Sequence, residues 1–368
     1  MHPILAEWLE GELRDVAPTR WVEVHIGAAE WWERHGDVDL AIDHAAAVGD
    51  IDRSEQLIVT NAATHFPMAG HATVRRWLGR LPEDRIVRSP PLTALATMAA
   101  IHIGDGDVAR RWNLNLSNLV GESSAARDVD DEASMIAESL RVALEVRPTS
   151  ELIDSARRAN RHMPPGVWRT NTFWLLGAQL FMAGDERCVS AWDEGVLDAE
   201  IVGARLLIAH NLAGSAMFSE LTGDTASAVE RGRRVQAIVR SANATLLPPT
   251  ALAVAISALV EARSGRHDAA AEEMAIVSRH LEGYRSIAPW MNTIVRLVMV
   301  RTALLIDDRL AIRKLLREAE QFALLPGDAW GALQHIDALR QQFEALPSMA
   351  FNGAGSLTAA ERRVLAYL

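Results

Sequence analysis

Side chains that could bind a ligand gather in three segments of the sequence. Trp168, Asn171 and Trp174 are spaced three residues apart, so they share one broad face if their segment is helical. Two later segments carry side chains of the same kinds: His210, Asn211, Trp290, Asn292 and Arg296. Aromatic faces beside amide and guanidinium donors suit a small molecule or an extended peptide. The pattern predicts a binding surface, with the alternative that these tryptophans are core anchors.

Patterns typical of catalysis or of a cofactor are missing from the sequence. There is no Gly-x-x-x-x-Gly-Lys phosphate loop, and the one lysine, Lys314, has no such neighbours. Cys188 is the one cysteine, which excludes an intrachain disulfide. His65 and His71 stand six positions apart, where a loop metal site is the alternative to solvated or buried histidines. We therefore expect a chain that is not an enzyme and that holds no cofactor and no metal.

The composition restricts the kinds of partner that the chain can bind. Half of the residues are hydrophobic, at 49%, so a large core can form. The formal charge of −11 argues against a surface that binds nucleic acid, because such surfaces need basic patches. No apolar run approaches the roughly 18 residues of a transmembrane helix. We expect a cytoplasmic protein without a membrane partner.

Helices must position these side chains, and the evidence for helices is a repeat of tight turns. The turns fall at Gly36-Asp37, Gly104-Asp105, Gly184-Asp185, Gly223-Asp224, Gly265 and, in degenerate form, Asp307-Asp308. With a further turn at residues 147–149 (Arg-Pro-Thr), they recur about every forty residues from position 104 onward. That is the length of a helix-turn-helix repeat unit. In this arrangement the glycine ends one helix in the left-handed conformation and the aspartate caps the next.

Small side chains stand at two fixed distances from the turn glycines. Five positions later are Ala41, Ala109, Ala228 and Ala270, with Val189 as the exception. Seven positions earlier are Ala29, Thr97, Gly177, Ala216 and Ala258. Antiparallel helices joined by a short turn can touch only where side chains are small. We predict an all-α fold of TPR-like helical hairpins stacked into a superhelix (an α-solenoid), with an irregular helical bundle as the alternative.

The two ends of the chain carry motifs of a different kind. Residues 357–368 (Leu-Thr-Ala-Ala-Glu-Arg-Arg-Val-Leu-Ala-Tyr-Leu) resemble the opening of a LuxR-type helix-turn-helix domain, commonly Leu-Thr-x-Arg-Glu-x-x-Val-Leu. Ala360 stands where arginine is usual, and Thr358 with Glu361 fits a capping box. Near the other end, residues 30–37 (Glu-Trp-Trp-Glu-Arg-His-Gly-Asp) lead into residues 41–45 (Ala-Ile-Asp-His-Ala). This run is similar to the junction after the winged helix of MalT-like regulators.

The resemblance implies a division of the chain into four parts. Residues 1–20 would be the remnant of a winged-helix domain, and residues 21–346 a TPR-like helical-repeat sensor domain. Residues 347–356 would be a linker, and residues 357–368 the first helix of a truncated helix-turn-helix domain. In such regulators a separate N-terminal domain binds ATP and the C-terminal domain binds DNA, so both would lie outside this chain.

The same resemblance implies the effector-sensing region of a LuxR-type transcriptional regulator. Its concave groove would bind a small-molecule effector or a partner, and the bound state would control the DNA-binding domain. Self-association is a further expectation. The alternative is a protein-interaction scaffold without a small-molecule ligand. A closed cavity lined by tryptophan would favour a metabolite, whereas a long open groove would favour a protein.

Overall fold

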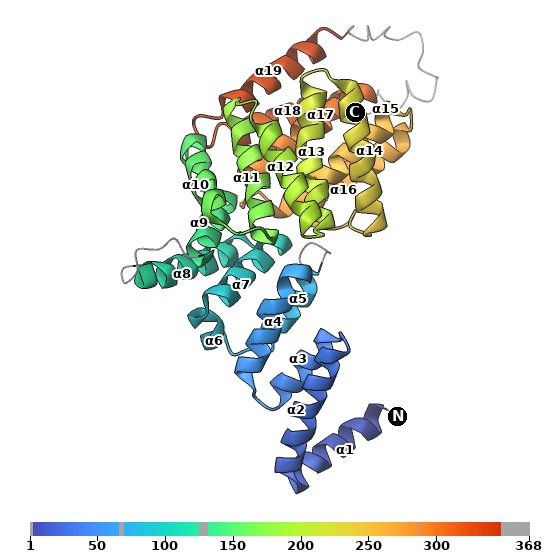
Figure 1. Ribbon diagram of the computed structural model, residues 1–368. Coiled ribbons are helices and arrows are strands. Elements are labelled where there is room, and N and C mark those ends of the chain that lie inside the picture. The colour runs from blue at the N-terminus through green and yellow to red at the C-terminus, as the bar shows by residue number, and fades with distance from the viewer. Residues whose placement is uncertain (1–2, 66–69, 125–131, 286, 347–368) are drawn as a thin grey trace, which may run out of the picture.

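The computed structural model describes residues 3–65, 70–124, 132–285 and 287–346, and this part of the chain is helical and without β-strands (Figure 1). The N-terminal helices are α1 (Pro3–Val16), α2 (Pro18–Arg34), α3 (Val38–Ala47), α4 (Ile51–His65), α5 (His71–Leu78), α6 (Glu83–Arg88), α7 (Pro90–Ile103), α8 (Gly106–Ser124), α9 (Glu132–Leu144) and α10 (Thr149–His162). The C-terminal helices are α11 (Val167–Ala183), α12 (Cys188–Ile201), α13 (Arg205–Leu221), α14 (Thr225–Ser241), α15 (Ala251–Arg263), α16 (His267–Gly283), α17 (Pro289–Leu305), α18 (Arg309–Ala323) and α19 (Trp330–Glu344). A short 3-10 helix, η2 (Pro248–Thr250), precedes α15.

The turns lie where the sequence predicts them. The backbone has positive φ at Gly36, Gly104, Gly184, Gly223, Gly265 and Asp307. After four of these turns the side chains of Asp37, Asp105, Asp224 and Asp308 each accept a hydrogen bond from the backbone N–H three residues later. These carboxylates satisfy an N–H that the first turn of a helix leaves free, and they favour the positive end of the helix dipole. The Gly-Asp pairs therefore end one helix and begin the next.

The small residues around the turns are buried between paired helices, as expected. They are Ala29, Thr97, Gly177, Ala216 and Ala258 before the turns, and Ala41, Ala109, Ala228 and Ala270 after them. Val189 is partly buried. The first helix of each pair contacts the second along its length in α7–α8, α11–α12, α13–α14, α15–α16 and α17–α18. The expected all-α class of stacked helical hairpins is confirmed.

The C-terminal half of the superhelix closes on itself. The first helices of its pairs, α11, α13, α15 and α17, contact one another in sequence, and α19 returns to contact both α11 and α17 (Figure 1). The return is tight, because Gly331 at the start of α19 lies against Gly184 at the end of α11. A β-carbon on Gly331 would lie 2.2 Å from the backbone nitrogen of Gly184. The inner helices therefore form a packed ring here.

The buried apolar side chains form two clusters. The N-terminal cluster extends from Ala29 on α2 to Met163 after α10, and the C-terminal cluster extends from Ala100 on α7 to Leu339 on α19. Helices α7, α8, α9 and α10 each contribute side chains to both clusters. The two clusters therefore meet across these four helices.

Several predictions of domain organisation concern the ends of the chain. Residues 1–20, predicted as a winged-helix remnant, include α1 and the start of α2. The predicted linker (347–356) and the predicted first helix of a helix-turn-helix domain (357–368) lie outside the described residues. Among the helices that the structure describes, none combines the length and apolar composition that crossing a bilayer requires.

Candidate functional site

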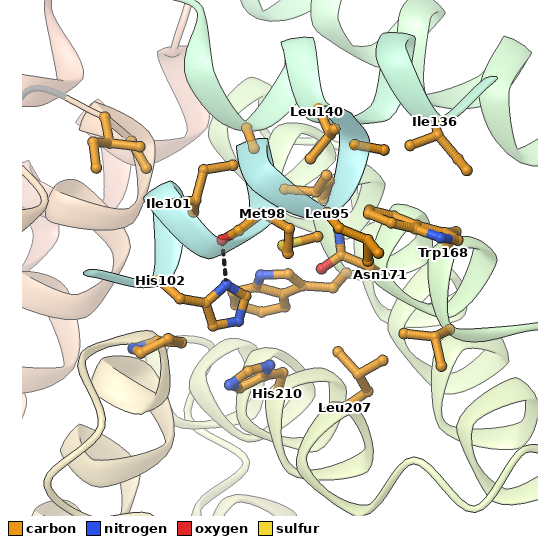
Figure 2. Close-up of a pocket in the computed structure, with 18 of the residues that line it drawn as sticks. Leu95, Met98, Ile101, His102, Ile136, Leu140, Trp168, Asn171, Leu207 and His210 are labelled. Carbon is orange, nitrogen blue, oxygen red and sulfur yellow. Dashed lines mark hydrogen bonds between the residues drawn. The ribbon is translucent and has the colours of Figure 1, made fainter. Parts of the chain in front are cut away.

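A cavity of about 640 Å³ lies where the two apolar clusters meet (Figure 2). Helices α7 and α9 form one wall, and α13, η2 and the start of α17 form the opposite wall. Helix α11 contributes residues between them. The volume of the cavity falls within the range of about 300–1,000 Å³ that is typical of sites for small organic ligands.

Five of the eight residues predicted to bind a ligand line this cavity: Trp168, Asn171, Trp174, His210 and Trp290. They come from α11, α13 and α17, three helices that the sequence separates widely. The ring of Trp174 lies 6.0 Å from the ring of His210 and 5.9 Å from that of Trp290, measured between centroids. Trp168 and Asn171 lie further along the cavity, on the preceding turns of α11 (Figure 2). Packing of α11 against α13 and α17 thus gathers these side chains.

The other three predicted residues lie outside the cavity. Asn211 is buried between α12 and α13, where its side-chain N–H donates to the Leu207 carbonyl at 2.9 Å. Asn292 donates to the Tyr284 carbonyl at 2.8 Å and accepts from Arg296 at 2.7 Å. Arg296 itself pairs with Glu318 and lines a second, smaller hollow of about 230 Å³. Asn211 thus bonds within α13 and Asn292 to the segment before α17, whereas Arg296 joins α17 to α18.

The wall formed by α7 and α9 is apolar, and the predicted set of polar and aromatic residues does not include it. Its side chains include Leu95, Met98 and Ile101 on α7, with Ile136 and Leu140 on α9 (Figure 2). The sequence does carry a signal for it. Most of α7 is buried, and its segment (Pro-Pro-Leu-Thr-Ala-Leu-Ala-Thr-Met-Ala-Ala-Ile-His-Ile) has no strongly polar face. A helix that is apolar all round must be covered on every side, by protein or by ligand.

Three residues of the opposite side carry buried polar atoms without hydrogen-bond partners. These atoms are His210 Nε2, Tyr284 Oη and Trp290 Nε1. All three residues line the cavity. A buried polar group without a partner costs about 1–3 kcal/mol, so such groups are few in folded proteins. Such atoms also occur elsewhere in the described part of the chain, and these three have almost no accessible surface, so they lie beneath the lining of the cavity rather than open to it.

Burial controls the protonation of these groups. It lowers the pKa of His210 to about 4, although the Pro249 carbonyl acts in the opposite direction. Burial also raises the pKa of the Tyr284 hydroxyl above its usual value. Near pH 7 the His210 ring is therefore neutral and the Tyr284 hydroxyl keeps its proton.

The cavity carries little charge. Among the described residues that line it, Glu132 is the one carboxylate, and neither lysine nor arginine occurs. Glu132 is exposed in the first turn of α9, at the edge of the cavity. His102 on α7 holds its Nδ1 at 2.7 Å from the Met98 carbonyl, one turn earlier in the same helix. The surroundings thus suit an uncharged molecule, because an ionised group would find no opposite charge deep in the cavity.

Nucleophilic chemistry finds no support at Cys188. The side chain is fully buried at the start of α12, and it belongs to the C-terminal cluster. Burial raises the pKa of its thiol to about 12, so the reactive thiolate is scarce near neutral pH.

Comparison with known proteins connects part of the chain with a regulator. Over 99 residues the chain is 30% identical to the HTH-type transcriptional regulator MalT of Yersinia enterocolitica serotype O:8. The chain resembles a transcriptional regulator. MalT of Yersinia pestis strain Pestoides F is 29% identical over the same length. Each match covers 27% of this chain and 11% of the regulator, so the shared stretch is a small part of the relatives. No family model matches the chain.

Proposed function

We propose that this chain is an effector-sensing region of a transcriptional regulator, and that its effector is a small molecule bound in the cavity. The observation that carries the proposal is the cavity itself, which Trp168, Trp174, His210 and Trp290 line from three helices. The partial likeness to MalT supports the regulatory role. In this proposal the chain is not an enzyme and uses no cofactor of its own.

The position of the cavity supports a sensing mechanism. A molecule held between α7 and α9 on one side and α13 and α17 on the other contacts both apolar clusters at once. It binds best to the arrangement of the two clusters that fits it, so binding shifts the population toward that arrangement. The free energy available for regulation is the difference in affinity between the arrangements. Binding of ATP and of DNA would belong to other parts of the regulator.

A screen with a blocked variant tests the proposal. Ala133, in the first turn of α9, lines the cavity and is partly exposed, so Ala133→Trp places an indole in the cavity at little cost to folding. Ala226→Trp is the matched control, because Ala226 is exposed in the first turn of α14. Thermal shifts of the three proteins are measured against a broad set of metabolites.

We expect at least one compound to raise the melting temperature of the wild type and of Ala226→Trp but not of Ala133→Trp. Ligand at a hundred times its dissociation constant stabilises the folded state by about 2.7 kcal/mol, which such an assay detects easily. If every stabilising compound raised the melting temperatures of all three proteins equally, the result would contradict the proposal.

The alternative, a protein-interaction scaffold, has one observation in its favour. The N-terminal helices expose large apolar side chains, among them Trp8 (60% exposed), Val16 (73%) and Trp31 (44%). Exposed apolar groups of this size often mark protein contacts. Capture of a specific protein that Trp31→Glu abolishes, with no cavity-dependent small molecule in the screen, would favour the scaffold.

A further inference from the structure

The cavity has two chemically different walls, and together they restrict the class of ligand. We propose that the ligand is an uncharged amphiphile: an apolar body of alkyl or ring carbons that ends in one hydroxyl or carbonyl group. This inference rests on the proposed function and makes it more specific. In the bound state the apolar body lies against α7 and α9. The polar end meets His210, Tyr284 and Trp290 after small movements of the side chains that cover their polar atoms.

The polar end is defined by the hydrogen bonds that remain unmade. Trp290 Nε1 can only donate, and the Tyr284 hydroxyl can donate or accept. The Pro249 carbonyl acts on the His210 ring, and a carbonyl only accepts. With the proton on the nitrogen that faces Pro249, His210 Nε2 becomes an acceptor. A ligand hydroxyl fits this set, because it can donate to His210 while it accepts from Trp290 or Tyr284.

The apolar wall determines the rest of the molecule. Leu95, Met98 and Ile101 on α7 face a body that needs no hydrogen bonds (Figure 2). A sugar or another polyol would leave most of its hydroxyl groups against these side chains without partners, which is costly. The rings of Trp168 and Trp174 add further apolar surface on α11. The apolar side chains therefore select a ligand with few polar groups.

The absence of buried charge excludes ionised head groups. The described lining contains no lysine and no arginine that could pair with a carboxylate or a phosphate. A cationic head group would find Glu132 alone, at the exposed edge and away from the unpartnered atoms of α13 and α17. Transfer of an unpaired charge into an apolar site is far more costly than transfer of a hydroxyl. Matched ligands that differ only in the head group can measure this preference.

The first test is titration calorimetry of the wild-type chain with four probes: 1-decanol, decanoate, decyltrimethylammonium and sucrose. We expect 1-decanol to bind, and to bind at least tenfold more tightly than each of the other three. Ala133→Trp should abolish this binding, whereas Ala226→Trp should retain it. Decanoate, decyltrimethylammonium or sucrose binding as tightly as 1-decanol would overturn the inference, as would failure of 1-decanol to bind.

The second test removes the polar partners one at a time. Tyr284→Phe deletes only the unpartnered oxygen, so the free protein should be as stable as the wild type or more stable. The same variant should bind 1-decanol about three- to tenfold more weakly, the value of one hydrogen bond. His210→Leu should weaken binding by a similar factor. Unchanged affinity in both variants would overturn the assignment of the polar end.

The two proposals fail in different ways. A cavity-dependent hit in the metabolite screen that proves to be an anion, a cation or a polyol would refute the ligand class and leave the sensing role intact. A screen without any hit that depends on Ala133, together with no binding of 1-decanol, would refute both.

Discussion

His210 lines the cavity, and its protonation also affects the stability of the chain at acid pH. Its ring packs against Trp174, and its Nε2 atom is buried without a partner. The folded chain keeps this ring neutral down to about pH 4, whereas an unfolded chain takes up the proton near pH 6.5. Between these values the unfolded state binds more protons, so the free energy of unfolding falls as the pH falls. Burial lowers the pKa of His280 and His335 in the same direction.

The prediction at this scale concerns His210→Gln, which removes the titrating group and keeps a polar side chain. From pH 7.5 to pH 5 the wild type should lose about 2 kcal/mol more unfolding free energy than the variant. Urea denaturation at the two pH values measures the difference. His267→Gln is the control, because it makes the same substitution at an exposed position at the start of α16. Equal losses in wild type and His210→Gln would refute the role of His210.

Helices α11, α12 and α13 are held together around one indole. Trp192 on α12 is fully buried, and its Nε1 donates to the Trp174 carbonyl on α11 at 3.3 Å. Gly177 and Gly214 face the two sides of this indole from α11 and α13. A β-carbon on Gly177 would lie 2.3 Å from Trp192 Nε1, and one on Gly214 would lie 2.4 Å from the indole ring. Both glycines therefore make room for Trp192, which in turn supports the backbone that carries Trp174.

Gly177→Ala should therefore destabilise the chain by about 1–3 kcal/mol, the usual cost of overpacking a core. Gly27→Ala is the matched control, because Gly27 is also inside a helix and has open space around it. That change should stabilise the chain by up to about 1 kcal/mol through helix propensity alone. Chemical denaturation compares the two variants. Similar effects of both substitutions would show that the indole is not tightly held.

How far the sequence predicts the molecule depends on the range of the interactions. Turn glycines, capping aspartates and small helix-contact residues act within one hairpin, and the sequence locates them. Trp192 was not singled out, because its glycine neighbours come from two other helices. The return of α19 to α11 joins residues that are far apart in the chain, and no local pattern marks such a contact.

In the candidate site, too, sequence patterns did not determine which face of each helix lines the cavity. Residues follow one another at 3.6 per turn, so adjacent positions point about 100° apart. His210 lines the cavity, and its neighbour Asn211 consequently points toward α12. Trp290 lines the cavity as well, and Asn292, two positions later, points away from it. The residue types indicated three helices that line the cavity, whereas which faces of them line it depends on the packing.

At the scale of the whole molecule, a loop of the C-terminal end holds a helix of the middle. Asp328 precedes α19 and accepts hydrogen bonds from the backbone N–H groups of Thr149 and Ser150, 178 to 179 residues away. The Ser150 hydroxyl donates to it at 2.9 Å. Burial raises the pKa of Asp328, but the hydrogen bonds from Ser150 and Thr149 outweigh it and leave the pKa below its usual value. Asp328 thus caps α10 from a distant part of the chain.

The Asp328 cap on α10 links the packed ring of C-terminal helices to the helices that line the cavity. Helix α10 packs against both α9 and α11, and both of those helices line the cavity. Gly331, three residues after Asp328, makes the close contact with Gly184 at the end of α11. The segment before α19 therefore touches α10, which packs against α9, and the end of α11, which lines the cavity.

Asp328→Ala should cost about 0.5–2 kcal/mol of stability, the range measured for lost helix caps. Hydrogen exchange should accelerate most at Thr149, at Ser150 and along α19, because the cap and the return of α19 depend on one segment. Asp337→Ala is the control, since Asp337 pairs with Arg340 on the exposed face of α19 and such pairs contribute little. If the superhelix acts as one body, a cavity ligand should slow exchange at Thr149 in the wild type and lose this effect in Asp328→Ala. Protection confined to α7, α9 and α13 would mean that ligand binding stays local and does not reach the C-terminal end.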